Sequence, residues 1–408
     1  MKNFVQNELV LPCGTVLKNR IAKSAMSEAL GTPDHRSDHR LERLYGRWCK
    51  GGAGLLITGN IMVDKHALGE PANVAFEKNR DYSDLNRWAR AGKENGTHIW
   101  TQLNHPGKQS PKFLSREPVA PSSIELKPPL NKMFNRPRAL SEDEIYKIIE
   151  AFALGAKASK EAGFTGVQIH GAHGYLVSQF LSPLHNQRED QWGGSLENRM
   201  RFVVLVYKAI REEVGPAFPV SIKLNSADFQ RGGFTKEESM DVVETLSKLG
   251  MDLIEVSGGT YESPEMTGVT RKGSTMAREA YFLEYCEEIR SRVKTPLMLT
   301  GGFRSLTGMN NALASGSCDV IGLARSMAIN PDFPKQLLEG KTVESKVKFL
   351  TTGYKQLDKL FPLEITWYTH QLQLMGEGKE PDVEMSAGGS ILRTICTMGI
   401  QGIKRVRS

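Results

Sequence analysis

Two histidines three residues apart, His170 and His173, open the stretch of sequence with the clearest chemical potential, and Tyr175 follows two residues later. A polar, glycine-bearing loop and an apolar helical pattern come next, an order that a packed core does not require. Three kinds of chemistry suit the two histidines: binding a metal, acting as acid and base, or donating hydrogen bonds to a substrate oxygen. A metal site would need further ligands, for which His105 and Asp228 are the candidates. Histidines that serve only the structure are the remaining alternative.

The bulk composition excludes several other classes of protein. The chain has 408 residues and a net charge of +7, which is spread along the sequence apart from the final "IKRVRS". No basic stripe interleaved with aromatic residues is present, so nucleic-acid binding is disfavoured. The five cysteines lie far apart and form no metal or disulfide pattern. Because no run approaches ~18 apolar residues and the first residues lack a leader pattern, we expect a cytoplasmic protein without a membrane span.

Short β-branched runs recur along the chain, with helical patterns between them. Ser141 with Glu144 forms a capping box, and Ser195 and Thr235 are further candidate N-caps. Strands that alternate with helices predict a parallel sheet, and eight such units predict a closed (β/α)8 TIM barrel of the α/β class. The eight predicted strands cover residues 19–26, 53–60, 98–104, 166–171, 219–226, 252–258, 296–302 and 319–325.

Three segments lie outside this repeat. An N-terminal hairpin that turns at residues 12–14 would close the floor of the barrel. Residues 106–138 are rich in proline and too polar for a core, which predicts a long loop after the third strand. We expect the barrel domain to span residues 1–340, and residues 341–408 to form a C-terminal helical extension that packs on the barrel or on a neighbouring subunit.

The carboxyl ends of the predicted strands are rich in polar and small residues. Chemistry in this fold lies at those ends, so eight similar ends indicate one large polar ligand across the mouth. Gly301 and Gly302 follow the seventh strand, where they form either a tight turn or, with Arg325 in the next loop, a phosphate site. Gln102 could donate to and accept from a pyrimidine-like ring. Lys223 would face an anion, unless its ammonium group only caps the sheet in water.

Four segments of the sequence resemble one known family. They are "NRIAKSAM", "QLNHPG", "HGAHGYLVSQFLSPLHNQREDQWGGSLENR" and "TGG…GLAR", and their order resembles that of the Old Yellow Enzyme family of FMN-dependent oxidoreductases over roughly residues 5–340. The resemblance implies a barrel that carries non-covalent FMN across its mouth and uses NADH or NADPH as co-substrate. It also implies that a small activated alkene, typically an α,β-unsaturated carbonyl compound, takes the hydride after the nicotinamide has left.

The resemblance implies a role for individual residues as well. His170 and His173 would hold the substrate carbonyl oxygen, and Tyr175 would donate a proton to the α-carbon. Gln102 would reach the pyrimidine portion of the flavin, and Lys223 its N1/O2 region. The other expected cofactor contacts are Ser24, Ala25, Met26, Ser27 and Asn60 near the ring, and Gly301, Gly302, Ala324 and Arg325 at the phosphate.

Charge development gives these roles a physical reason. Hydride addition to the β-carbon pushes negative charge onto the carbonyl oxygen, where two imidazole N–H groups would form an oxyanion clamp. Loss of one such donor typically costs about 10²–10³ in rate. A phenol is a suitable acid for the α-carbon, because a carbanion-like centre is far more basic than a phenolate.

The chain departs from the family pattern at several positions, which leaves the natural substrate open. Ala25 stands where proline is common, Asn60 where a small residue is common, and Lys223 where arginine is common. Ser27 replaces a threonine or cysteine that often tunes the flavin, and Ala29 lacks an aromatic ring over the substrate. Alternatives in the same fold are an NADH oxidase or a dienoyl-CoA-reductase-like flavoenzyme. From other classes, a metal-dependent barrel hydrolase and a flavin-binding protein without turnover also stay open. Whether the protein forms a homo-oligomer is open as well.

Overall fold

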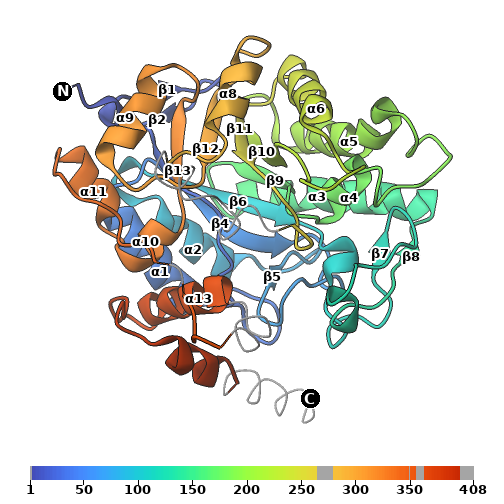
Figure 1. The fold of residues 1–408 in the computed structure, drawn as a ribbon, viewed down its shortest axis with the longest axis horizontal. Coiled ribbons are helices and arrows are strands. Elements are labelled where there is room, and N and C mark those ends of the chain that lie inside the picture. Colours follow the sequence, from blue (N-terminus) through green and yellow to red (C-terminus); the bar gives the residue numbers. More distant parts are fainter. Residues whose placement is uncertain (1, 264–278, 349, 355–362, 396–408) are drawn as a thin grey trace.

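Eight parallel strands close into a barrel (Figure 1). The computed structural model describes residues 2–263, 279–348, 350–354 and 363–395. The first strand pairs with both the second and the last, which closes the barrel and confirms the predicted fold. In order around the barrel the strands are β3 (Ile21–Lys23), β4 (Leu55–Met62), β6 (His98–Asn104), β9 (Val167–Gly171), β10 (Val220–Asn225), β11 (Leu253–Ser257), β12 (Leu297–Thr300) and β13 (Val320–Leu323).

Helices follow the strands and surround the barrel (Figure 1). The predicted helix starts are confirmed: Ser141 and Glu144 form a capping box. Thr235 and Glu238 form a second one, and the Ser195 side chain accepts a hydrogen bond at a third start. The helices are α1 (His39–Lys50), α2 (Ser83–Gly92), α3 (Glu142–Glu161), α4 (Leu176–Leu181), α5 (Leu196–Val214), α6 (Lys236–Lys248), α8 (Leu283–Arg290), α9 (Leu306–Ala314), α10 (Arg325–Ile329), α11 (Phe333–Leu338) and α13 (Leu363–Gly376).

The barrel interior changes from apolar at its floor to polar at its mouth. Because side chains alternate along a strand, residues two apart face the same side. On β11 this series runs through Leu253, Glu255 and Ser257, and on β6 through Trp100 and Gln102. Leu253 and Trp100 belong to an apolar cluster, whereas the next residues in each series are buried polar groups. The same alternation that builds the strands therefore stacks a polar layer above an apolar one.

The predicted N-terminal hairpin completes the floor. β1 (Leu9–Val10) pairs antiparallel with β2 (Val16–Leu17). Gly14 in the turn has φ 87°, a conformation that glycine adopts without steric cost. Leu9, Leu11 and Leu17 of the hairpin belong to the apolar cluster of the barrel floor. The hairpin leucines thus cover the apolar residues of the barrel floor and exclude water from them.

Two further segments lie beside the barrel. The long loop after β6 contains the short strands β7 (Val119–Ala120) and β8 (Arg138–Ala139), which pair with each other. The helix α13 packs against α1 and α10, where Trp367 and Tyr368 are buried. The Thr369 hydroxyl of α13 donates to the carbonyl oxygen of Ser27 at 3.1 Å. This part of the C-terminal segment therefore contacts the loop that follows β3.

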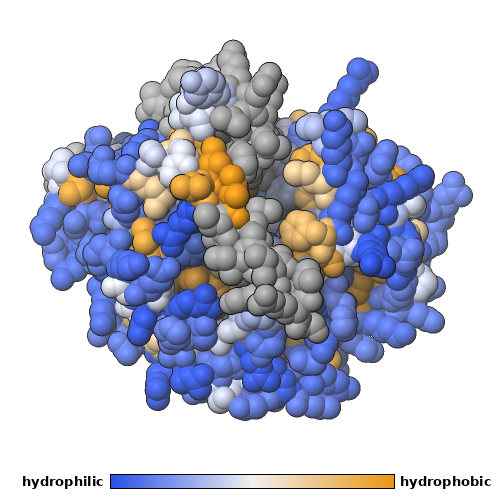
Figure 2. Space-filling model, turned by 90° about the horizontal axis from the view of Figure 1, so that it is seen from below, coloured by the Kyte–Doolittle hydropathy of each residue, from blue (hydrophilic) through white to orange (hydrophobic). Residues whose placement is uncertain are grey.

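The surface on the side of α13 is mostly hydrophilic. Figure 2, which views the molecule from below Figure 1, shows a group of hydrophobic residues near the centre of this face. Within the described ranges, no helix is both long and apolar enough to cross a membrane.

Candidate active site

The end of β9 and the loop after it bring His170, His173 and Tyr175 together at the mouth. The ring centroids of His170 and His173 are 5.2 Å apart, and those of His170 and Tyr175 are 4.7 Å apart. His173 has φ 63°, which is uncommon for a residue with a side chain. Its backbone N–H donates to Asn225 Oδ1 at 3.2 Å, and a β-bridge joins it to Thr260 after β11. Contacts to the end of β10 and to the loop after β11 thus hold this strained position in place.

Both imidazoles are held in the neutral form. Burial lowers the pKa of His170 well below its ordinary value, and the charges of His173 and Lys223 act in the same direction. Burial, followed by the charge of Lys223, lowers the pKa of His173 to about 3. His170 Nδ1 accepts from the backbone of Ala172 at 3.3 Å, so its Nε2 carries the proton. His173 Nε2 lies 2.8 Å from Ser257 Oγ, and a serine that donates there leaves the Nδ1–H of the ring as a donor.

The phenol of Tyr175 is also neutral and buried. Burial raises its pKa well above the ordinary value, and Tyr261 and Glu70 raise it further, whereas the side chain of Asn60 lowers it. The Tyr175 and Tyr261 hydroxyl oxygens are 2.8 Å apart. Asn60 lies inside β4, which continues beyond the predicted end at residue 60, and it is paired with Gln102 of β6. One phenol and two imidazole rings therefore lie close together at the mouth.

A buried polar network crosses the barrel in the layer below. Gln102 Nε2 donates to Gln168 Oε1 at 2.7 Å, and Gln168 Nε2 donates to Glu255 Oε2 at 2.8 Å. The other oxygen of Glu255 lies 3.0 Å from Lys223 Nζ and accepts from Thr300 Oγ1 at 2.7 Å. Lys223 is only 3% exposed, so the alternative prediction, that its ammonium group caps the sheet in water, is wrong. The anion beside it is a carboxylate of the protein itself.

Glu255 and Gln168 are not among the residues predicted for the site. The sequence does contain a sign that Glu255 is unusual, because this carboxylate lies in the middle of the apolar run "DLIEVSG". A buried charge of this kind needs a partner. Lys223 is that partner, because it lies directly opposite Glu255 in the pairing of β10 with β11.

The loop after β3 lines another side of the mouth. Ser24 is buried, and its Oγ lies 2.8 Å from Thr300 Oγ1, which links this loop to the polar layer. Ala25, Met26 and Ser27 are half-buried. These four predicted cofactor contacts therefore occupy consecutive positions along the rim.

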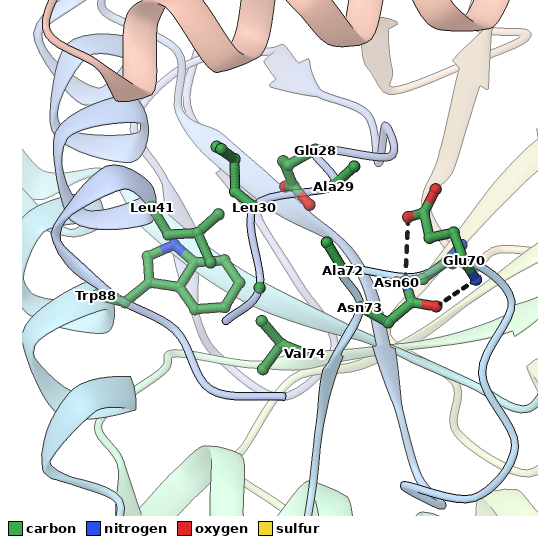
Figure 3. A pocket seen from close by; sticks show the side chains of 11 residues that line it. Glu28, Ala29, Leu30, Leu41, Asn60, Glu70, Ala72, Asn73, Val74 and Trp88 are labelled. Carbon is green, nitrogen blue, oxygen red and sulfur yellow. Dashed lines mark hydrogen bonds between the residues drawn. The ribbon is translucent and has the colours of Figure 1, made fainter. Parts of the chain in front are cut away.

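Two carboxyl groups face a small hollow next to this loop (Figure 3). Glu28 accepts from the backbone N–H of Gly59 at 2.8 Å. Asn73 Nδ2 donates to Glu70 Oε1 at 3.0 Å, and Figure 3 shows these two side chains beside Asn60. Burial raises the pKa of Glu70 to about 7, and the charge of Glu28 adds to the rise. The side chains of Ser27 and Asn73 favour its ionised form. Glu70 therefore changes charge near neutral pH, which its sequence context did not indicate.

The predicted phosphate residues follow β12 and β13. Gly301 and Gly302 have φ values of 124° and 90°, which a residue with a side chain rarely adopts. Ala324 is the N-cap of α10. Arg325 Nη1 lies 2.7 Å from Glu364 Oε2, so a carboxylate of α13 pairs with the cation expected to bind phosphate. Glu364 is a second acidic partner that the sequence analysis missed.

The candidate metal ligands His105 and Asp228 accept hydrogen bonds from nearby backbone N–H groups. His105 Nδ1 accepts from the backbone of Gly107 at 3.1 Å. Asp228 accepts from the backbone of Phe234 at 3.1 Å. In the part of the chain that the structure describes, no group of three or more His, Cys, Asp or Glu side chains is arranged to hold a metal ion.

Comparison with known proteins decides the family. Residues 13–344 match the model of the NADH:flavin oxidoreductase / NADH oxidase family. The chain belongs to this family. It is an oxidoreductase with FMN as its cofactor and NAD(P)H as co-substrate.

Individual relatives support this assignment. The chain is 37% identical over 356 residues to the NADH-dependent flavin oxidoreductase iliE of Hypocrea jecorina (strain QM6a), which covers 81% of this chain and 88% of the relative. It is 35% identical over 405 residues to the NADH-dependent flavin oxidoreductase iccE of Talaromyces variabilis, a match that covers 90% of this chain and 97% of the relative. Among solved structures, the Old Yellow Enzyme homologue from Zymomonas mobilis gives a TM-score of 0.71 at 25% identity, with 84% and 94% covered. Morphinone reductase gives 0.69 at 25% identity, with 83% and 90% covered.

The donor set at the mouth is chemically suited to FMN. The amides of Gln102 and Asn60 can pair with the carbonyl and N–H groups of a pyrimidine-like ring. Asn60 Oδ1 is buried and has no hydrogen-bond partner among the described residues, so a ring N–H could satisfy it. Lys223 carries a positive charge in the buried polar network. Arg325 lies at the start of α10, and its guanidinium group can bind phosphate with two parallel hydrogen bonds.

Proposed function

We propose that this enzyme uses NAD(P)H to reduce the C=C bond of α,β-unsaturated carbonyl compounds or related activated alkenes in a ping-pong cycle. FMN, when bound, would supply the two-electron redox chemistry that links NAD(P)H to the alkene. The observation that carries the proposal is that two neutral imidazoles and one neutral phenol lie side by side at the mouth.

His170 and His173 would bind the substrate carbonyl oxygen. Negative charge grows on that oxygen as the β-carbon receives its hydride, and fixed N–H donors stabilise this charge without having to reorient. Because the pKa of each imidazolium is lowered, both rings are neutral, and a neutral imidazole N–H donates a hydrogen bond but is too weak an acid to give up its proton. The oxygen is thus held as an anion, and the proton must come from elsewhere.

Tyr175 would supply that proton to the α-carbon. Its raised pKa keeps the phenol protonated at neutral pH, which is the state that a general acid needs before the reaction. Its ring lies 4.7 Å from that of His170, so one substrate could contact both side chains through its adjacent carbonyl and α-carbon atoms.

Other residues would hold the cofactor. Lys223 would face the flavin ring with its charge already balanced by Glu255, so it would act mainly as a hydrogen-bond donor. Arg325 would bind the phosphate in exchange for, or together with, Glu364. The remaining proposed contacts are Ser24, Ala25, Met26, Ser27, Asn60 and Gln102 around the ring, and Gly301, Gly302 and Ala324 at the phosphate.

The variant Tyr175→Phe tests the proposal by separating the two half-reactions. Under anaerobic conditions we expect NAD(P)H to reduce the bound flavin of the variant at the wild-type rate. Reoxidation by an enone such as cyclohexenone should slow by about 10²–10⁴, the usual contribution of a general acid. Tyr207→Phe is the control, because this tyrosine lies on α5 and donates to the carbonyl oxygen of Leu249. Equal loss in both half-reactions of Tyr175→Phe would contradict its role as proton donor.

An NADH oxidase is the second candidate, because a relative carries that name. The NADH oxidase of Thermoanaerobacter brockii is 33% identical over 336 residues, which covers 81% of this chain and 50% of the relative. The two functions differ in the electron acceptor. A screen of activated alkenes with NADH and with NADPH, with and without oxygen, separates them by whether saturated product forms when oxygen is absent.

A further inference from the structure

Two phenols meet at the proposed proton-donating point. The hydroxyl oxygens of Tyr175 and Tyr261 are 2.8 Å apart, and their ring centroids are 5.8 Å apart with the planes at 69°. Tyr175 follows β9 and Tyr261 follows β11, so the contact joins two separate loops of the mouth. Tyr175 is buried, whereas Tyr261 is only half-buried. The second phenol is therefore the member of the pair that reaches towards the surface.

The residues on either side of Tyr261 fix its position. Thr260 forms a β-bridge with His173, which ties the loop to the proposed oxyanion clamp. On the other side, Glu262 accepts from the backbone N–H of Lys127 at 2.9 Å, so the long loop after β6 also holds it. The contacts of Thr260 and Glu262 thus hold the backbone on both sides of Tyr261, which keeps its side chain beside Tyr175.

A lone buried phenol is a poor proton donor. Burial raises the pKa of Tyr175 well above its ordinary value and that of Tyr261 to about 12, because a phenolate loses its hydration there. A hydroxyl that donates to a phenolate oxygen offsets this loss through a charge-assisted hydrogen bond. The contact lowers the pKa of Tyr261 and raises that of Tyr175, so the pair releases its first proton more readily than an isolated buried phenol and its second with more difficulty.

We propose that Tyr261 stabilises the negative charge that develops on the Tyr175 oxygen as Tyr175 protonates the substrate, and that it relays the replacement proton. The O–H bond of Tyr175 breaks as the C–H bond at the α-carbon forms. In the same step the Tyr261 hydroxyl proton passes to the Tyr175 oxygen, and solvent water then returns a proton to Tyr261. The net reaction consumes one solvent proton for each hydride delivered. This role rests on the proposed alkene reduction, and Tyr261 acts through Tyr175 as a positioning residue.

The variant Tyr261→Phe in the FMN-loaded enzyme tests this role. We expect flavin reduction by NAD(P)H to be unchanged, and enone-dependent reoxidation to slow between about 10-fold and 100-fold, as for the loss of one hydrogen bond to a charged group. Tyr285→Phe is the matched control, because this buried tyrosine lies on α8 and contacts Ser239 Oγ at 2.7 Å. A rate for Tyr261→Phe equal to that of the wild type, while Tyr175→Phe is slow, would overturn the inference.

A proton inventory provides a readout that a purely structural role would not change. The reoxidation rate is measured in mixtures of H2O and D2O. The rate should curve with deuterium fraction in the wild type and curve less in Tyr261→Phe, because one exchangeable proton fewer moves in that step. Equal curvature in the two proteins would overturn the relay. If the wild type does not reduce any enone, the proposed function fails instead, and that outcome is recognisable without either variant.

Discussion

Lys223 and Glu255 form an ion pair whose side chains are 4% and 0% exposed, at the centre of the polar layer. The variants Lys223→Met and Glu255→Gln remove one charge each. Either single change leaves the other charge buried without its partner, whereas the double variant leaves two neutral side chains of similar volume. The free energy of unfolding of the four proteins therefore measures how strongly the pair is coupled.

The contacts of the pair set the expected magnitudes. Removal of one partner from a buried ion pair costs about 3–5 kcal/mol, and replacement of both partners is often close to neutral. Glu255 also accepts from Gln168 and Thr300. In the double variant, a glutamine amide in its place leaves one of these donors without an acceptor and costs about 1–3 kcal/mol. We expect each single variant to be less stable than the double variant, with a coupling energy of about 3 kcal/mol or more.

Urea unfolding of the flavin-free protein is the assay, because bound FMN would add its own stabilisation. Lys236 and Glu288 provide a control pair at 2.8 Å, with side chains 43% and 50% exposed. Lys236→Met and Glu288→Gln should show little or no coupling, as is usual for exposed pairs. Additive effects at Lys223 and Glu255 would refute the interpretation that Glu255 is the anion that balances this lysine.

Three other changes give separate predictions. Wild-type enone reduction should fall as pH rises through about 7, because the Glu70 carboxylate then raises the pKa of Tyr175, and Glu70→Gln should flatten the pH profile of this step between about pH 6 and 8. Ser257→Ala removes the 2.8 Å partner of His173 Nε2 and should weaken enone binding about 2- to 10-fold, seen as a raised KM. Thr235→Ala removes the cap of α6 and should lower the unfolding free energy by about 1 kcal/mol without loss of activity. A pH profile with the same slope in both proteins, an unchanged KM or unchanged stability would contradict the respective prediction.

The fold could be predicted because its signals are local. Alternation, capping boxes and glycines after helices each depend on a few neighbouring residues, so all eight strands and the three helix starts at Ser141, Ser195 and Thr235 were found. The bounds were less certain. The predicted second strand ended at Asn60, but the pairing of β4 with β6 shifts between Ile57 and Asn60, and the strand runs on to residue 62.

The partners in the site could not be predicted in the same way. Tyr175 and Tyr261 are 86 residues apart, and Arg325 and Glu364 are 39 apart. Such contacts depend on strand register and on where α13 packs, and neither follows from a single sequence. His170, His173 and Tyr175 could be proposed from the sequence because they lie close together in one segment. Their partners lie in segments whose composition is ordinary.

The central claim is that His170 and His173 hold an oxygen anion against bound FMN. Titration of the FMN-loaded enzyme with a para-substituted phenol, followed by long-wavelength absorbance, tests it most directly. The account predicts a saturable charge-transfer band in the wild type, at least about tenfold weaker binding in His170→Ala, and no change in the control His66→Ala, whose side chain is exposed. A wild type without this band, or equal affinity in His170→Ala, would contradict it.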